Sequence, residues 1–163
     1  MSDTFFKKWY EIWNKPELSE FGLFSFGIIY ASTLIMRYLH TMIRVVDLEK
    51  SLHFYTQGLN FEVKSRQDYE KDRFSLVFLE SKDDSGRGVQ IELTHNWDTH
   101  SYVKGDAYGH MAFAVDSIEK IQKQLQANGY DLSWGPGKTP SGTTKMAFID
   151  DPDGYEIELL EKN

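Results

Sequence analysis

The chain has 163 residues, a formal net charge of −7 at pH 7 and no cysteine. This length suits one domain, or two small fused repeats, with a real hydrophobic core, and the 15% aromatic and 26% charged residues exclude a disordered chain. The acidic balance, without any cluster of Lys and Arg, argues against binding to nucleic acid. Without cysteine there is no disulfide, any metal site must use nitrogen and oxygen ligands, and a cytoplasmic location fits.

Residues 1–35 are expected to form an N-terminal extension of unknown role. Positions 21–36 carry no charge, but this segment is shorter than the roughly 20 residues that a membrane-spanning helix needs. A signal peptide would begin with basic residues, whereas acids outnumber bases up to Glu20. We therefore favour an extension, or an upstream start codon before Met36, that takes no part in the chemistry over a membrane or partner anchor. The functional domain is expected to span residues 36–163.

The first half of this domain reads as a strand, a helix and three further strands. Alternation over residues 38–46 predicts a strand in which His40 and Arg44 share one face. Asp47 is expected to cap the following helix, whose apolar stripe comprises Leu48, Leu52, Tyr55 and Leu59. Strands are predicted around 61–65, 73–80 and 88–95. In the last of them Gln90, Glu92, Thr94 and Asn96 share a face.

The second half repeats this order. A strand at 109–115 leads to Asp116, which is expected to form a pair like a capping box with Glu119. The helix that follows has a buried stripe of Ile118, Ile121 and Leu125 and is closed by Gly129. Shorter strands, the segment 146–149, a turn at 151–154 and a strand at 155–161 complete it. The sequence thus predicts two βαβββ repeats, 37–97 and 107–161, in an α+β fold of curved, mainly antiparallel sheets.

Each repeat opens with a histidine and closes with a glutamate. His40 and His110 lie 70 residues apart, and Glu92 and Glu158 lie 66 apart. One histidine in an apolar strand is more often a hydrogen-bonded core residue, and one such glutamate usually faces solvent. Recurrence at equivalent places favours a metal site instead, because two imidazoles and two carboxylates suit divalent Ni, Co, Zn, Mn or Fe. Structural roles are expected for the remaining histidines, His53, His95 and His100.

From Met36 onward the chain resembles glyoxalase I, the lactoylglutathione lyase family of the vicinal-oxygen-chelate superfamily. The segments that carry this resemblance are Leu39 to Val45, Ser51 to Tyr55, Ile91 to Trp97, Ala107 to His110, and Asp151 to Tyr155 leading to Glu158. Together these motifs are highly specific. The Asp-Pro-Asp-Gly turn alone recurs across the superfamily and says little.

The resemblance implies a function and a set of site residues. It implies a metal-dependent lyase that isomerises the methylglyoxal–glutathione hemithioacetal to S-lactoylglutathione through a metal-bound enediolate. The implied metal ligands are His40, Glu92, His110 and Glu158, which would meet across a homodimer interface, with the first two from one subunit and the others from its partner. Glu158 matches the position of the catalytic base, and Glu92 is its pseudo-symmetric counterpart. Arg44 and Asn96 match positions that hold glutathione, and strand alternation independently places them on the faces of His40 and Glu92.

Two departures from the family bear on the metal and on the substrate site. Family members that prefer zinc carry an insertion before the second histidine, whereas only 13 residues separate Asn96 from His110 here. This spacing resembles the short bacterial type activated by Ni(II) or Co(II), although Zn(II) stays possible. Lys145 is offset by one residue from a basic position of the family and is not included in the site. The alternatives are an iron-dependent extradiol dioxygenase and a non-catalytic module that binds a small molecule.

Overall fold

The computed structural model describes residues 36–82 and 88–162. The chain divides into two units after Met36, and the unit Arg37–Asn163 contains every helix and strand considered below. The N-terminal extension, with all but the last residue of the uncharged segment 21–36, lies outside the described residues. Within the part that is described, no helix is both long and apolar enough to cross a membrane.

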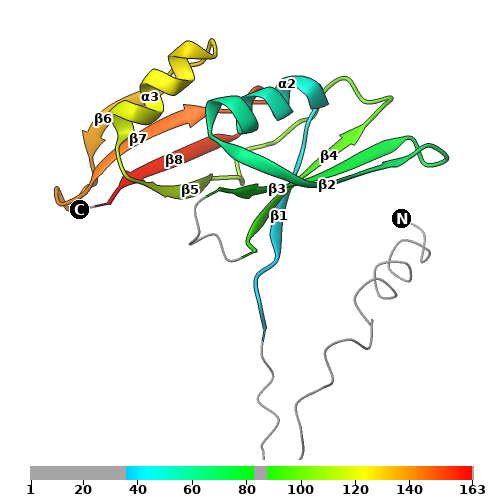
Figure 1. Cartoon of the computed structure of the whole chain (residues 1–163), viewed down its shortest axis with the longest axis horizontal. Helices are drawn as coiled ribbons and strands as arrows, with labels where there is room; N and C mark the ends of the chain where they lie inside the picture. The colour runs from blue at the N-terminus through cyan, green and yellow to red at the C-terminus, as the bar shows by residue number, and fades with distance from the viewer. Residues whose placement is uncertain (1–35, 83–87, 163) are drawn as a thin grey trace, which may run out of the picture. The chain divides into compact units, whose positions relative to one another are not determined.

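The two repeats form two four-stranded sheets with the same topology (Figure 1). Repeat one consists of β1 (His40–Arg44), α2 (Leu48–His53) continuing as the π-helix η2 (Phe54–Gly58), β2 (Phe61–Tyr69), β3 (Phe74–Ser81) and β4 (Gln90–Asn96). Repeat two consists of β5 (His110–Val115), α3 (Ile118–Ala127), β6 (Trp134–Lys138), β7 (Lys145–Asp150) and β8 (Glu156–Glu161). The sheet orders are β1-β4-β3-β2 and β5-β8-β7-β6, in which only the β1–β4 and β5–β8 pairs are parallel. The predicted α+β fold with two βαβββ repeats is confirmed.

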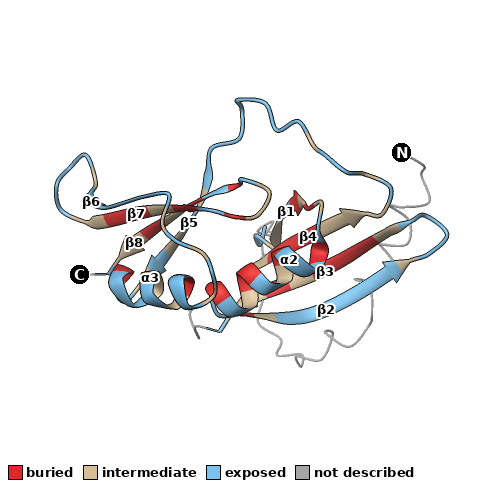
Figure 2. Ribbon diagram, turned by 90° about the horizontal axis from the view of Figure 1, so that it is seen from above, coloured by how far each residue is buried: buried red, intermediate tan, exposed pale blue. Residues whose placement is uncertain are grey.

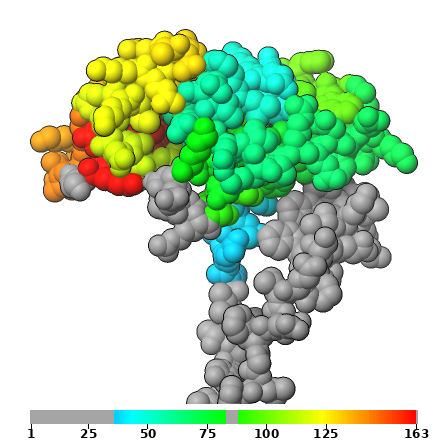
Figure 3. All heavy atoms as spheres, in the orientation of Figure 1, coloured from blue at the N-terminus to red at the C-terminus, as the bar shows by residue number. Residues whose placement is uncertain are grey.

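Strand alternation sends apolar side chains towards the helices and polar ones to the opposite face of each sheet. Ile43, Ile91 and Leu93 are buried in the core with Leu125 of α3 and Leu159 of β8. Both helices lie on the same side of the sheets (Figure 1) and adjoin each other on the molecular surface (Figure 3). Among the described residues, no helix covers the opposite faces, which carry the histidines and glutamates.

The two repeats are joined by contacts between aromatic rings and between buried polar groups. The ring centroids of Phe61 and Phe113 lie 5.4 Å apart, and those of Phe54 and Tyr130 lie 5.0 Å apart. The buried Tyr55 hydroxyl donates a 2.9 Å hydrogen bond to the Asp151 carboxylate. The turn of repeat two thus docks on the helix of repeat one.

Burial raises the pKa of both groups in this polar contact. For Tyr55 burial is the largest cause, and the negative charge of Asp151 raises the pKa further. For Asp151 burial also dominates, although hydrogen bonds from the Tyr155 backbone and the Tyr55 hydroxyl oppose it.

Three local predictions need correction. The helix of repeat two is capped by Ser117, whose hydroxyl accepts from the Lys120 backbone N–H at 3.3 Å, and the prediction of Asp116 was wrong by one residue. The Glu161 carboxylate accepts from the Ile118 N–H at 2.8 Å, whereas Asp116 pairs with Lys162.

The other two corrections concern repeat one. Strand β2 reaches Tyr69 rather than residue 65. The prediction was too short because the outer half of the strand is exposed (Figure 2) and therefore shows no apolar alternation. The chain widens into a π-turn after His53, and the buried residues of its helix are Leu48, Ser51, Phe54, Tyr55 and Gly58. Leu52 and Leu59 are only partly buried.

Candidate metal centre

The first histidine and glutamate meet on the open face of repeat one. His40 Nε2 lies 3.0 Å from Glu92 Oε2, and the Glu92 side chain is only 8% exposed. The parallel pairing of β1 with β4 creates this contact. Met42 is opposite Glu92, and His40, two residues before Met42, lies on the same face of the sheet. The Phe78 ring, opposite Glu92 on β3, meets the His40 ring edge to face with centroids 5.5 Å apart.

Repeat two builds the same arrangement. His110 Nε2 lies 3.2 Å from Glu158 Oε2. Phe148 lies opposite Glu158 on β7, and its ring centroid is 5.7 Å from that of His110. This pair is more open than the first, because the His110 side chain is 41% exposed against 24% for His40. A second carboxylate, that of Glu156, lies 3.9 Å from His110 Nδ1.

The donors of each pair fit one divalent metal ion. Two neighbouring ligands of a six-coordinate ion, each bound at about 2.1 Å, lie about 3.0 Å apart, and the two pairs measure 3.0 and 3.2 Å. Nitrogen and oxygen donors without thiolate suit Ni, Co, Zn, Mn or Fe. The four predicted ligands form two separate pairs, however, and the described residues contain no cluster of three or more potential metal ligands.

The comparisons with known proteins agree with this arrangement of the chain. Residues 37–159 match the Glyoxalase/Bleomycin resistance protein/Dioxygenase superfamily. The chain belongs to this superfamily. Over 127 residues it is 45% identical to the lactoylglutathione lyase of Neisseria meningitidis, which covers 78% of the chain and 91% of that relative.

Two solved structures of the superfamily extend the likeness to the fold. Glyoxalase I from Zea mays matches with a TM-score of 0.72 and 30% identity over 77% of the chain. The chain spans only 44% of the length of that maize protein. The Leishmania major glyoxalase I, described as trypanothione-dependent, matches with a TM-score of 0.65 and 38% identity, covering 78% of the chain and 87% of that protein.

The two residues predicted to hold glutathione lie on the same strands of this superfamily fold as His40 and Glu92. Arg44 is opposite Thr94 in the β1–β4 pair, one pleat beyond Glu92. Asn96 ends β4, where its side-chain amide donates a 2.8 Å hydrogen bond to the Tyr102 hydroxyl. The structure thus places both residues on the strands that carry the first pair, and their role in binding glutathione stays a prediction.

Sequence reasoning missed three residues that contact the pairs or the glutathione positions. Thr94 donates from its hydroxyl to Glu92 Oε1 at 3.0 Å. Tyr102 lies in the irregular segment between the repeats, where no periodicity identifies it. Burial, and then the negative charge of Glu92, raises the pKa of the Tyr69 phenol, so this phenol interacts electrostatically with the first pair. Of the three, only Thr94 had a usable signal, namely its place on the face of Glu92.

The residues left out of the site have other contacts. His53 Nδ1 is hydrogen-bonded to the Tyr130 hydroxyl at 3.1 Å, and His95 Nδ1 lies 3.2 Å from the Val45 carbonyl oxygen. Lys145 pairs with Glu119 and lies 3.5 Å from Glu161. These contacts agree with the structural roles expected for the two histidines and with the omission of Lys145.

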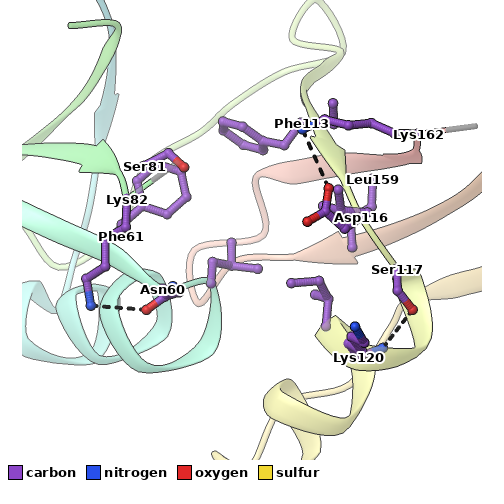
Figure 4. A pocket seen from close by; sticks show the side chains of 14 residues that line it. Asn60, Phe61, Ser81, Lys82, Phe113, Asp116, Ser117, Lys120, Leu159 and Lys162 are labelled. Atoms are coloured by element: carbon purple, nitrogen blue, oxygen red, sulfur yellow. Dashed lines mark hydrogen bonds and ion pairs between the residues drawn. The ribbon is translucent and has the colours of Figure 1, made fainter. Parts of the chain in front are cut away.

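A cavity of about 530 Å³ opens at the seam between the repeats (Figure 4). Its lining includes the aromatic rings of Phe61 and Phe113 and the side chains of Lys82, Lys120 and Lys162. Neither histidine–glutamate pair lines it. His110 instead lines a different cavity, of about 450 Å³.

Proposed function

We propose that this protein is a metal-dependent glyoxalase I, which isomerises the hemithioacetal of methylglyoxal and glutathione to S-lactoylglutathione and so detoxifies methylglyoxal. The observation that carries the proposal is the pair of matching half-sites, His40–Glu92 at 3.0 Å and His110–Glu158 at 3.2 Å. Both lie in a chain that is 45% identical to a lactoylglutathione lyase across the whole repeat region.

The complete site would combine half-sites from two protomers. One pair supplies one nitrogen and one oxygen ligand, which is too few to hold an ion firmly. In a homodimer the His40–Glu92 pair of one protomer would face the partner's His110–Glu158 pair, and the symmetry would make two such sites. Four ligands would then leave two positions of a six-coordinate ion for the substrate.

The reaction moves one proton between adjacent carbons and consumes no other reactant. The proton leaves the carbon that bears sulfur and hydroxyl, and a proton is returned to the neighbouring carbonyl carbon. The hydroxyl proton passes to the oxygen of that former carbonyl, which gives a thioester and an alcohol. Glu158 is the proposed carrier, because a carboxylate beside the reacting carbons is a competent base and acid in turn. When bound, a divalent ion would supply Lewis acidity that stabilises negative charge on the substrate oxygens.

Arg44 and Asn96 would hold the glutathione portion of the substrate. Along a strand, four residues cover about 13 Å at roughly 3.3 Å per residue, so Arg44 lies well away from the His40 imidazole. A guanidinium at that distance suits a carboxylate of the tripeptide, and the Asn96 amide supplies both a donor and an acceptor. That the thiol held by these residues is glutathione is itself part of the proposal.

The short spacing between Asn96 and His110 favours Ni(II) or Co(II) over Zn(II) as the activating ion, and a cytoplasmic location fits a glutathione-dependent enzyme. The activity is tested by stripping the purified protein with a chelator, returning one metal at a time, and following thioester absorbance with preformed hemithioacetal. We expect turnover with Ni(II) or Co(II). No turnover with Ni, Co, Zn or Mn would reject the proposed function.

Mixed dimers test the shared site. One protomer carries His40→Ala with Glu92→Gln, the other carries His110→Ala with Glu158→Gln, and each has a different affinity tag. If sites are shared, the mixed dimer contains one doubly damaged site and one intact site, so we expect about half of the wild-type activity. If each protomer held its own site, every site would be damaged and the mixed dimer would stay inactive.

A further inference from the structure

The register of the two sheets shows which residues of the repeats are equivalent. Around the glutamates, Phe78 corresponds to Phe148, and both lie opposite a glutamate on the neighbouring strand. Two residues after each glutamate the residue type differs between the repeats. Repeat one has Thr94 at this position, whereas repeat two has Leu160. Thr94 and Leu160 still occupy equivalent positions, because Thr94 is opposite Arg44 on β1 and Leu160 is opposite Ala114 on β5.

This difference changes how the two carboxylates are held. Glu92 uses both oxygens, because Oε2 faces His40 Nε2 at 3.0 Å while Oε1 accepts the Thr94 hydroxyl at 3.0 Å. The Glu158 carboxylate faces His110 Nε2 at 3.2 Å through Oε2. The side chain of Leu160 has no hydrogen-bonding group to offer the second oxygen.

We propose that Thr94 is a positioning residue that holds the Glu92 carboxylate in one orientation, so that Glu92 is the fixed ligand of the site. This inference rests on the proposed function. The terminal torsion of a glutamate is broad and defines no single orientation by itself. A hydroxyl on the same strand removes that freedom before any ion binds.

Loss of the Thr94 hydroxyl has a measurable consequence. Hydrogen bonds to ligating carboxylates orient them, and their loss typically weakens metal affinity 10- to 100-fold. The Thr94 hydroxyl should therefore determine metal affinity.

The test compares three variants with the full-length wild type. Thr94→Val keeps the shape and the β-branch but removes the hydroxyl, and Thr94→Ser restores a hydroxyl. Thr41→Val is the matched control, because Thr41 lies on β1 one residue after His40 and faces the other side of the sheet. Affinity for Co(II) is measured by competition with a chromophoric chelator, and the visible Co(II) spectrum reports the ligand field.

We expect Thr94→Val to bind Co(II) about 10- to 100-fold more weakly, with an altered spectrum, while Thr94→Ser and Thr41→Val stay near wild type. Unchanged affinity in Thr94→Val, or equal losses in Thr94→Val and Thr94→Ser, would overturn the inference. A wild type that binds Co(II) without turnover would reject the proposed function alone, and one that binds no metal would reject both.

Discussion

Repeat one encloses its glutamate, whereas repeat two leaves its glutamate more open. The side chain of Glu92 is 8% exposed and that of Glu158 is 15% exposed, and the two partner histidines differ in the same direction. The backbone does not cause the difference, since both sheets have the same strand order and the same parallel pair. The side chains around the two glutamates differ, both two residues along the strand and on the neighbouring strand.

The same comparison extends across each sheet. Met42 is opposite Glu92 where repeat two has the smaller Ala112 opposite Glu158. On the outer strand of each sheet, Ser65 of β2 is opposite Phe78, whereas Trp134 of β6 is opposite Phe148. The two repeats therefore share the histidine and glutamate that can ligate a metal, and they differ in the side chains around this pair. Different surroundings allow two carboxylates in one site to take different roles.

The largest expected effect breaks the equivalence of the two glutamates. Glu158→Gln keeps the shape but removes the proton-accepting carboxylate, so we expect kcat to fall by roughly 10²- to 10⁴-fold. Glu92→Gln should act first on metal affinity, because it removes the fixed ligand. Steady-state kinetics at saturating Ni(II) and a chelator competition separate the two effects.

Glu70→Gln, in the exposed turn after β2, is the control and should match wild type. Circular dichroism verifies that each variant is folded. Full activity in Glu158→Gln would remove its role as proton carrier. Identical kinetic and metal-binding defects in Glu158→Gln and Glu92→Gln would show that the repeats are functionally equivalent.

Much of this site was predictable because strand alternation has a period of two. Once His40 and Glu92 were placed in strands, their faces followed, and so did the faces of Arg44 and Asn96. The contact between His40 and Glu92 also follows from two strands that are neighbours in the sheet. The meeting of the two half-sites across a homodimer stays a prediction, because within the described part of one chain they form two separate pairs.

Other features depend on contacts that the sequence pattern does not encode. Ser117 rather than Asp116 caps α3 because Glu161, far along the chain, occupies the next backbone N–H. The exposed half of β2 lacks alternation because neither face is buried. Tyr102 meets Asn96 through the conformation of an irregular loop. In each case a tertiary contact decides, and local propensity alone is uninformative.

A smaller effect is expected where the repeats are joined. Tyr55→Phe leaves the buried Asp151 carboxylate without the 2.9 Å hydrogen bond from the phenol, and we expect a loss of about 1–3 kcal/mol in the free energy of unfolding. Urea denaturation at pH 7 measures it. The corresponding control is Tyr69→Phe, whose hydroxyl donates an exposed hydrogen bond to the Gln67 side chain and which should have a smaller effect.

The same contact predicts a dependence on alkaline pH. Burial, and then Asp151, raises the pKa of Tyr55 in the folded state above the value of about 10 of an unfolded chain. The unfolded state therefore loses its proton first, and the contribution of Tyr55 is fully present below pH 10 and lost as the pH rises beyond it. Tyr55→Phe should show a flatter decline of stability above pH 10. An unchanged slope would contradict this assignment.

The smallest expected effect compares how the two helices end. The residue after each C-cap adopts a left-handed conformation, with φ of 59° at Asn60 in repeat one and 83° at Gly129 in repeat two. Glycine adopts this conformation freely, whereas a side chain costs roughly 1–2 kcal/mol, less for asparagine. Gly129→Ala should therefore lower the free energy of unfolding by about 1 kcal/mol.

Asn60→Gly is the reciprocal change, and it should stay within about 0.5 kcal/mol of wild type, because relief of the left-handed strain is offset by the greater entropy of glycine in the unfolded chain. It also removes the 3.0 Å hydrogen bond from Lys82 to the Asn60 side chain, which is exposed and contributes little. Urea denaturation of both variants measures the contrast. A loss in Asn60→Gly equal to that in Gly129→Ala would show that Asn60 stabilises its turn through its side chain, and that the two helix ends rely on different interactions.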